Sequence, residues 1–193
     1  MFTKINENVK KAKKSCKQEP KTKSYVILCT RDMMIVPIKA NLNPYNNRPW
    51  FSGGTPQFFG GSADGENDPL KTLQREVTEE SRRTLRLNAI SGRVFEAPPA
   101  NGDQNTYNFY YSIEWQRTGT QWNDNVTNST EREMQRLVEV QLSDMLPDGS
   151  DSVIISRLLY DTDTVNAVGI NTFRTSHTAA AFVTFIRRIW NSL

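Results

Sequence analysis

The stretch FFGGSADGENDPLKTLQREVTEES, residues 58–81, decides the fold, because an apolar run ends in two glycines and a helix-forming segment follows an acidic loop. Asn67 or Asp68 can cap that helix. Pro69 suits the first helical turn, where the N–H that proline lacks would be unpaired in any case. An apolar stripe at helical spacing consists of Leu70, Leu73 and Val77. We therefore predict a strand, a glycine-rich loop and an amphipathic helix.

The opposite face of this helix gathers like charges. Glu76, Glu79 and Glu80 lie at i, i+3 and i+4, so each neighbouring pair costs about 0.3 kcal/mol. A bound cation would reverse that cost, and clustered oxygen ligands suit a hard divalent ion such as Mg²⁺, which takes further ligands from a phosphate substrate.

An ordinary surface helix is the alternative interpretation of these charges. Arg75 and Glu79 form an i,i+4 pair, and Arg82 or Arg83 could neutralise the remaining glutamates. The segment before the helix favours a site, because the Gly60-Gly61 pair and the loop at 62–66 bring backbone groups and acids toward one pocket.

These residues resemble the motif of the Nudix hydrolases, which is Gly, five residues, Glu, seven residues, then Arg-Glu-aliphatic-any-Glu-Glu-any-Gly. Residues 75–80 match its centre residue for residue, and Gly61 lies at the spacing that the motif requires. Asn67 stands where the motif has its first Glu, with Glu66 one position early, and Arg82 replaces the final Gly. Phe59 also replaces the usual Pro. We expect Glu66 to reshape the loop and support the helix arginine, and Arg82 to lengthen the helix through residues 83–85.

The resemblance implies an α/β fold, a Nudix-like α/β/α sandwich around a mixed β-sheet. It also implies a Mg²⁺- or Mn²⁺-dependent hydrolase that cleaves the pyrophosphate bond of a nucleoside diphosphate linked to another moiety, with ADP-ribose-like nucleotides favoured. Glu79 and Glu80 would be metal ligands, and Glu76 a further ligand or a helper in activating water. The carbonyl of Gly61 would complete the inner shell, and Arg75 would orient the carboxylates.

Many members of that family use one more carboxylate from outside the helix, as a ligand or as the base that takes a proton from water. Residues 131–146 look like the acidic loop, strand and short helix that would supply it. Glu133 is the candidate and Glu131 the runner-up, while a solvated loop acid remains the alternative.

Further strands are expected at 25–30 and 33–40, joined as a hairpin by Arg31-Asp32, and at 90–95 and 105–115. Residues 176–190 have helical spacing and should pack on the sheet. The loop at 97–105 is of the type that selects substrates. Tyr107 or Phe109 could stack on a base, although core packing is the commoner role of such residues, and Glu114 is expected to face solvent.

Composition limits the class of protein. The 193 residues suit one domain, which we place at 25–193, after a basic extension at 1–24. That extension has eight lysines and two glutamates, a charge of +6, which leaves −3 for the remainder because the whole chain has +3. It is expected to be a solvated tail, or alternatively a contact for nucleic acid, acidic lipid or a partner.

The remaining composition excludes several chemistries. His177 is the single histidine, which argues against histidine triads and multi-histidine zinc sites. No apolar run is long enough for a membrane span, and no secretory signal is evident. Cys16 and Cys29 have neither metal-ligand spacing nor a disulfide framework, so we expect free thiols and a cytoplasmic protein.

Two further functions stay open. Asn67 and Arg82 would suit a Nudix-like module that binds nucleotides without turnover. The lysine-rich extension would suit an RNA-directed pyrophosphohydrolase that removes caps, since backbone affinity for RNA needs such charge. Homodimers are frequent in the family, so a homodimer is also expected as a partner arrangement.

Overall fold

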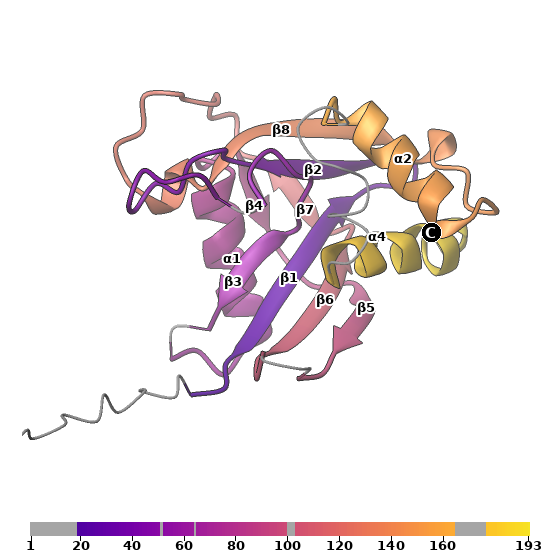
Figure 1. Cartoon of the computed structure of the whole chain (residues 1–193), viewed down its shortest axis with the longest axis horizontal. Coiled ribbons are helices and arrows are strands. Elements are labelled where there is room, and N and C mark those ends of the chain that lie inside the picture. Colours follow the sequence, from indigo (N-terminus) through magenta and orange to yellow (C-terminus); the bar gives the residue numbers. More distant parts are fainter. Residues whose placement is uncertain (1–18, 51, 64, 100–102, 165–176) are drawn as a thin grey trace, which may run out of the picture.

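The computed structural model describes residues 19–50, 52–63, 65–99, 103–164 and 177–193 (Figure 1). Its strands are β1 (Thr22–Cys29), β2 (Met33–Lys39), β3 (Phe59–Ser62), β4 (Leu85–Leu87), β5 (Gly92–Ala97), β6 (Thr106–Ser112), β7 (Trp115–Arg117) and β8 (Met134–Gln141). Its α-helices are α1 (Pro69–Glu80), α2 (Asp151–Asp161) and α4 (His177–Arg188). Single 3₁₀ turns lie at Thr130–Arg132, Leu142–Asp144 and Trp190–Ser192.

Strand β1 organises the larger sheet, whose order is β5-β6-β1-β2-β8 with β3 also paired to β1. The β1–β6 pair is parallel and the other pairs are antiparallel, so the sheet is mixed. On its other side β1 pairs first with β3, where Tyr25 faces Gly60, and then with β2, where Leu28 faces Ile35. The partners of β1 therefore diverge, and a fork opens between β2 and β3.

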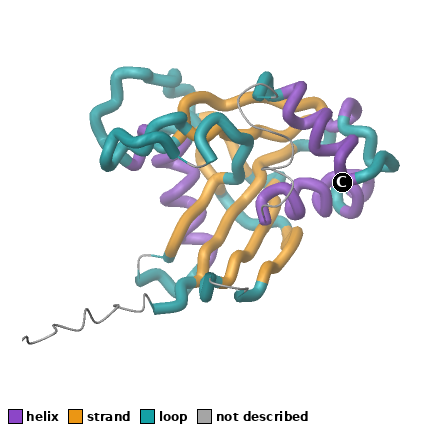
Figure 2. Tube along the Cα trace, in the orientation of Figure 1, coloured by secondary structure: helices purple, strands orange, loops and turns teal. Residues whose placement is uncertain are grey.

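Side chains of β1 alternate between two hydrophobic clusters. Val26 and Leu28 belong to the cluster that contains Leu73 and Val77 of α1, whereas Ile27 belongs to the one formed with α2 and α4. Because successive strand residues point to opposite faces, α1 covers one face of the sheet and α2 and α4 the other. The helices in Figure 2 flank the strands in this way. The predicted α/β/α sandwich around a mixed sheet is confirmed.

Helix α1 begins as predicted. The side chain of Asp68 accepts a hydrogen bond from the backbone N–H of Leu70 at 2.9 Å, and Pro69 occupies the first turn. Within the predicted apolar stripe, Leu73 and Val77 are fully buried.

The prediction that Arg82 lengthens this helix is wrong. The helix ends at Glu80, and Arg82 and Arg83 adopt left-handed conformations with φ of 51° and 66°. That region suits glycine and is uncommon for other residues. The chain therefore turns where the motif would have its glycine, and β4 begins at Leu85.

The hairpin over Arg31-Asp32 is confirmed, but the strand predicted at 105–115 is two strands in different sheets. β6 ends at Ser112, whose hydroxyl accepts a hydrogen bond from the N–H of Glu114 at 2.9 Å, and β7 then pairs with β4. Glu114 is exposed, as expected. The strand predicted at 90–95 lies two residues later, as β5.

The last part of the chain contains one predicted helix and one that was missed. The helix predicted at 176–190 is α4, and Ser176, the first residue of the predicted range, lies outside the described residues. Helix α2 was not predicted, although its buried residues recur at helical spacing: Ile154, Ile155, Leu158 and Leu159.

The basic extension lies largely outside the described residues, since residues 1–18, with Cys16 among them, are not described. Cys29 is a free thiol, and burial raises its pKa to about 12. None of the helices described is long and apolar enough to cross a membrane.

Gly60 should be indispensable to the β1–β3 pair. Its φ is 145°, and a Cβ there would collide with the backbone carbonyl of Ser24 and lie 2.7 Å from Cα of Tyr25. We expect Gly60→Ala to lower the free energy of unfolding by about 2 kcal/mol or more in denaturant titration. Gly119→Ala is the control, because Gly119 also has a positive φ but open space around it, and should cost about 1 kcal/mol. Equal losses would contradict the steric explanation.

Candidate active site

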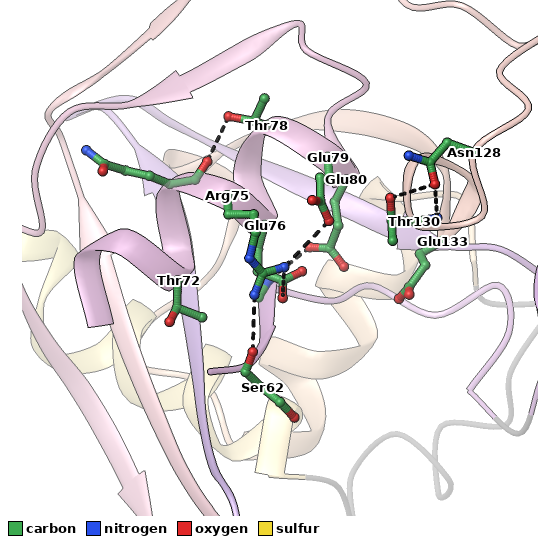
Figure 3. Close-up of polar contacts among 12 residues, drawn as sticks. Ser62, Thr72, Arg75, Glu76, Thr78, Glu79, Glu80, Asn128, Thr130 and Glu133 are labelled. Atoms are coloured by element: carbon green, nitrogen blue, oxygen red, sulfur yellow. Dashed lines mark hydrogen bonds and ion pairs between the residues drawn. The ribbon is translucent and has the colours of Figure 1, made fainter. Parts of the chain in front are cut away.

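The predicted site residues converge where β1 diverges between β2 and β3. A cavity of about 150 Å³ opens there and is lined by β1, Lys39 at the end of β2, Gly60–Ser62 of β3, Glu80 of α1 and Glu133 just before β8. Figure 3 shows Glu80 and Glu133, which line this space, on two different elements, with Glu76 and Glu79 beside Arg75. Segments far apart in sequence therefore meet at one point.

Glu80 is the most deeply buried of the carboxylates, with 2% of the residue exposed. Its Oε2 accepts a hydrogen bond from the backbone N–H of Gly60 at 2.8 Å. Burial raises the pKa of Glu80 well above its ordinary value, and the nearby charge of Glu76 raises it further, while the Gly60 hydrogen bond opposes both. The residue is thus a carboxyl group held at fixed position by the neighbouring strand.

Glu76 lies against the other glycine of the pair. A Cβ at Gly61 would lie 2.5 Å from Oε1 of Glu76, so a side chain there would force this carboxylate to move. Burial raises the pKa of Glu76 from 4.5 to about 7, and the charge of Arg75 offsets part of that shift. Gly61 therefore leaves room for the carboxylate of Glu76 in its present position.

Arg75 contacts the loop and two glutamates of its own helix. Its Nη1 lies 3.1 Å from Glu76 and 3.6 Å from Glu79, and its Nη2 donates to the carbonyl of Ser62 at 3.2 Å. Its Nε lies 3.9 Å from Glu66, so the early glutamate reaches this arginine as expected. These contacts suit the orienting role predicted for Arg75.

The structure separates the two candidates for the additional carboxylate. Glu133 lines the cavity, and the hydroxyl of Tyr45 donates a hydrogen bond to its Oε1 at 2.7 Å. Glu131 instead pairs with Arg83 at 3.2 Å. The geometry therefore favours Glu133.

Two neighbours of the site were missed by the sequence analysis. Tyr45 comes from an Asn- and Pro-rich loop, in which no pattern distinguishes it. Lys39 lies in the cavity with its Nζ 3.8 Å from the centre of the Trp50 ring. Burial lowers the pKa of Lys39, although the charges of Glu80 and Glu133 oppose the shift. A lysine at the end of an apolar strand was the available signal.

The predicted metal ligands do not form a ready coordination shell. Within the described part of the chain, no group of three or more histidine, cysteine, aspartate or glutamate side chains is placed to hold a metal ion. Glu79 lies 3.6 Å from Arg75, and Glu80 accepts a hydrogen bond from the Gly60 N–H. The donor set is still all oxygen, and burial leaves Glu76 and Glu80 with raised pKa values that a cation would lower, which suits a hard divalent ion.

The aromatic residues considered for base stacking differ in position. Phe109 is buried in the core, against Phe58. Tyr107 is partly exposed, with its ring 5.0 Å from that of His177 and stacked at 6.3 Å on Tyr25. Core packing is thus the role of Phe109.

Comparison with known proteins gives matches in structure alone. No family model matches the sequence, and no curated protein matches it. Among solved structures, a MutT Nudix hydrolase from Burkholderia pseudomallei is 12% identical, over 77% of this chain and 100% of that one, with a TM-score of 0.45. A Nudix hydrolase from Nitrosomonas europaea is 13% identical, over 65% and 74%, with a TM-score of 0.45. An ADP-ribose pyrophosphatase from Streptococcus suis is 14% identical, over 65% and 76%, with a TM-score of 0.39. A functional assignment therefore rests on the residues of the site.

Proposed function

We propose that this protein is a divalent-metal-dependent hydrolase that cleaves the pyrophosphate bond of a nucleoside diphosphate derivative. The observation that carries the proposal is the pair of contacts between α1 and β3, in which Glu80 bonds to Gly60 and Glu76 packs against Gly61. Together they bury carboxylates at the mouth of a cavity. Burial of charged carboxylates lowers the stability of the folded protein, and a helix with only a structural role would not need such residues there.

The residues on and next to α1 divide into two roles. Glu76, Glu79 and Glu80 would hold Mg²⁺ or Mn²⁺ together with the carbonyl of Gly61, and the ion would neutralise charge on the two phosphates. Arg75 keeps the helix carboxylates in position through its contacts with Glu76, Glu79 and Ser62.

Glu133 is the proposed acceptor of the proton from the attacking water. It lines the same cavity as Glu80 but comes from another element, so it can face a substrate from a second direction. The hydrogen bond from Tyr45 restricts where its carboxylate can point. Lys39, in the same cavity, places a positive group where a phosphate would enter.

Nucleoside diphosphates linked to a sugar are the substrate class to test first, with ADP-ribose-like nucleotides leading the panel. The partly exposed Tyr107 of β6 is stacked on Tyr25, which lines the cavity. A base or ribose could contact it. Nucleoside triphosphates, dinucleotides and capped RNA complete the panel.

Replacement of single ligands should strongly reduce turnover and spare the fold. Glu79→Gln and Glu80→Gln each remove a charge with little change in volume, so we expect kcat/KM to fall by roughly 100-fold or more. Glu114→Gln, an exposed carboxylate outside the site, should leave kcat/KM within about twofold of the unaltered protein. The measurement is product formation with Mg²⁺ or Mn²⁺ and with chelator.

The outcomes of that assay distinguish the alternatives. Full activity in both glutamine variants would refute the ligand assignment. Nucleotide binding without any product would favour the inactive binding module that Asn67 and Arg82 suggest.

The metal should stabilise the protein more at high pH than at low pH. The pKa of Glu76 is raised from 4.5 to about 7 by burial, so the folded protein retains a proton that the unfolded chain releases within that window. The stability this provides is complete below pH 4.5 and is lost as pH rises through about 7. A divalent ion must displace this proton, so the Mg²⁺-induced rise in Tm should be larger near about pH 8 than near about pH 5.5.

Glu76→Gln is the matched variant for this measurement, because it removes the titrating group. The difference between the two pH values should shrink in it. Equal rises in Tm at both pH values in the unaltered protein would contradict the assignment of Glu76.

A role of the basic extension in RNA binding is a separate prediction. Residues 1–24 have a charge of +6, so an RNA-directed enzyme should lose affinity steeply with salt and lose it on deletion of residues 1–18. If the substrate is a free nucleotide, the same deletion should leave kcat/KM nearly unchanged. Unchanged RNA affinity and turnover after deletion would exclude the RNA-directed role.

A further inference from the structure

Arg82, at the position where the Nudix motif has its last glycine, is buried in the turn after α1. Only 8% of the residue is exposed. Its guanidinium makes four hydrogen bonds. Nε donates to the carbonyl of Glu131 at 3.0 Å, and Nη2 donates to the carbonyl of Met134 at 2.9 Å. Nη1 donates to the carbonyl of Asn123 at 2.6 Å and to Oδ1 of Asp124 at 3.1 Å. The side chain therefore acts as a bridge between α1 and another segment.

That segment is the long loop between β7 and β8, at the upper left of Figure 1, which leads directly into Glu133. The ring of Trp122 covers the guanidinium, with Cζ of Arg82 4.1 Å from the ring centre. Its indole N–H donates to the same Asp124 oxygen at 3.0 Å. Arg82 is thus enclosed by the loop it bonds to.

Two of the hydrogen bonds bracket Glu133. The acceptors are the carbonyls of Glu131 and Met134, which precede and follow Glu133 in the chain. A planar guanidinium with donors in fixed directions holds both carbonyls at once, which the single point charge of a lysine cannot do.

The backbone conformation at this position argues for a compensating role. Arg82 has a φ of 51°, which glycine adopts freely and other residues adopt at a cost of about 1 kcal/mol or more. The hydrogen bonds of a buried guanidinium offset that cost.

We propose that Arg82 is a positioning residue that sets Glu133 relative to the helix carboxylates, an inference that rests on the proposed function. Arg82 follows Glu80 by two residues and donates hydrogen bonds to the backbone on both sides of Glu133. The groups that would hold the ion and the group that would accept the proton are therefore joined through one side chain. A displacement of about 1 Å between such groups can cost roughly 100-fold in rate.

The test compares Arg82→Lys with Arg83→Lys. Arg83 is the matched control, because it has the same chemistry and a left-handed φ of 66°, but its side chain is 73% exposed. Arg82→Lys should lower kcat by roughly 10- to 100-fold with little change in KM, whereas Arg83→Lys should change kcat by less than about twofold. Equal effects of the two substitutions would overturn the proposal.

A double-mutant cycle with Glu133→Gln separates positioning from general weakening of the structure. If Arg82 acts through Glu133, adding Arg82→Lys to Glu133→Gln should lower kcat by less than about twofold. A full additional loss in that background would mean that Arg82 acts elsewhere, and the proposal would fail.

Hydrogen exchange of the backbone amides tests the role of Arg82 without requiring turnover. Arg82→Lys should speed exchange across residues 121–134 while α1 and β1 stay protected, and Arg83→Lys should not. Unchanged exchange in that loop would overturn the proposal. Absence of any turnover in the unaltered protein would overturn only the proposed function. If Arg82→Lys does not fold, Trp122→Leu removes the ring over the guanidinium and should speed exchange in the same loop.

Discussion

The close approach of α1 to β3 is the constraint on which the rest of the site depends. The backbone N–H of Gly60 donates a hydrogen bond to Glu80, and Gly61, which has no Cβ, leaves room for the carboxylate of Glu76. A side chain at Gly60 would push β3 away from β1, and one at Gly61 would displace the carboxylate of Glu76. The same approach buries the carboxylates, and this burial gives them the raised pKa values that distinguish them from surface glutamates.

The divergence of β2 and β3 along β1 supplies the space in front of those carboxylates. The first part of β1 pairs with β3 and its last part pairs with β2 on the same edge. The cavity lies where β2 and β3 separate. Lys39 and Glu133 enter from the β2 side and Glu80 from the other. Groups of opposite charge thus surround one small volume, which is an arrangement that can bind an ion together with an anionic substrate.

Local sequence patterns predicted helix α1 and the β1–β2 hairpin, but not how Tyr45 and Glu133 meet at the cavity. The cap at Asp68, the stripe through Leu73 and Val77, and the hairpin over Arg31-Asp32 depend on residues close in sequence, and the structure confirms them. The choice between Glu131 and Glu133, and the contact of Tyr45 with Glu133, depend on how distant segments meet. Tyr45 and Glu133 are 88 residues apart, so no periodicity relates them. Helix α2 was missed, although its spacing was visible.

Arg82 illustrates why a departure from a motif need not mean a loss. At the level of sequence, arginine in place of glycine predicts a longer helix, because local propensity favours continuation. The structure shows a turn at the same place as the glycine would give, stabilised by tertiary hydrogen bonds rather than by backbone freedom. A glycine would permit this turn but could not make the side-chain hydrogen bonds to the neighbouring loop. An arginine adopts this turn with some backbone strain, and its side chain bonds to the loop that leads to Glu133. One substitution can therefore keep the end of the helix and add a connection to the site.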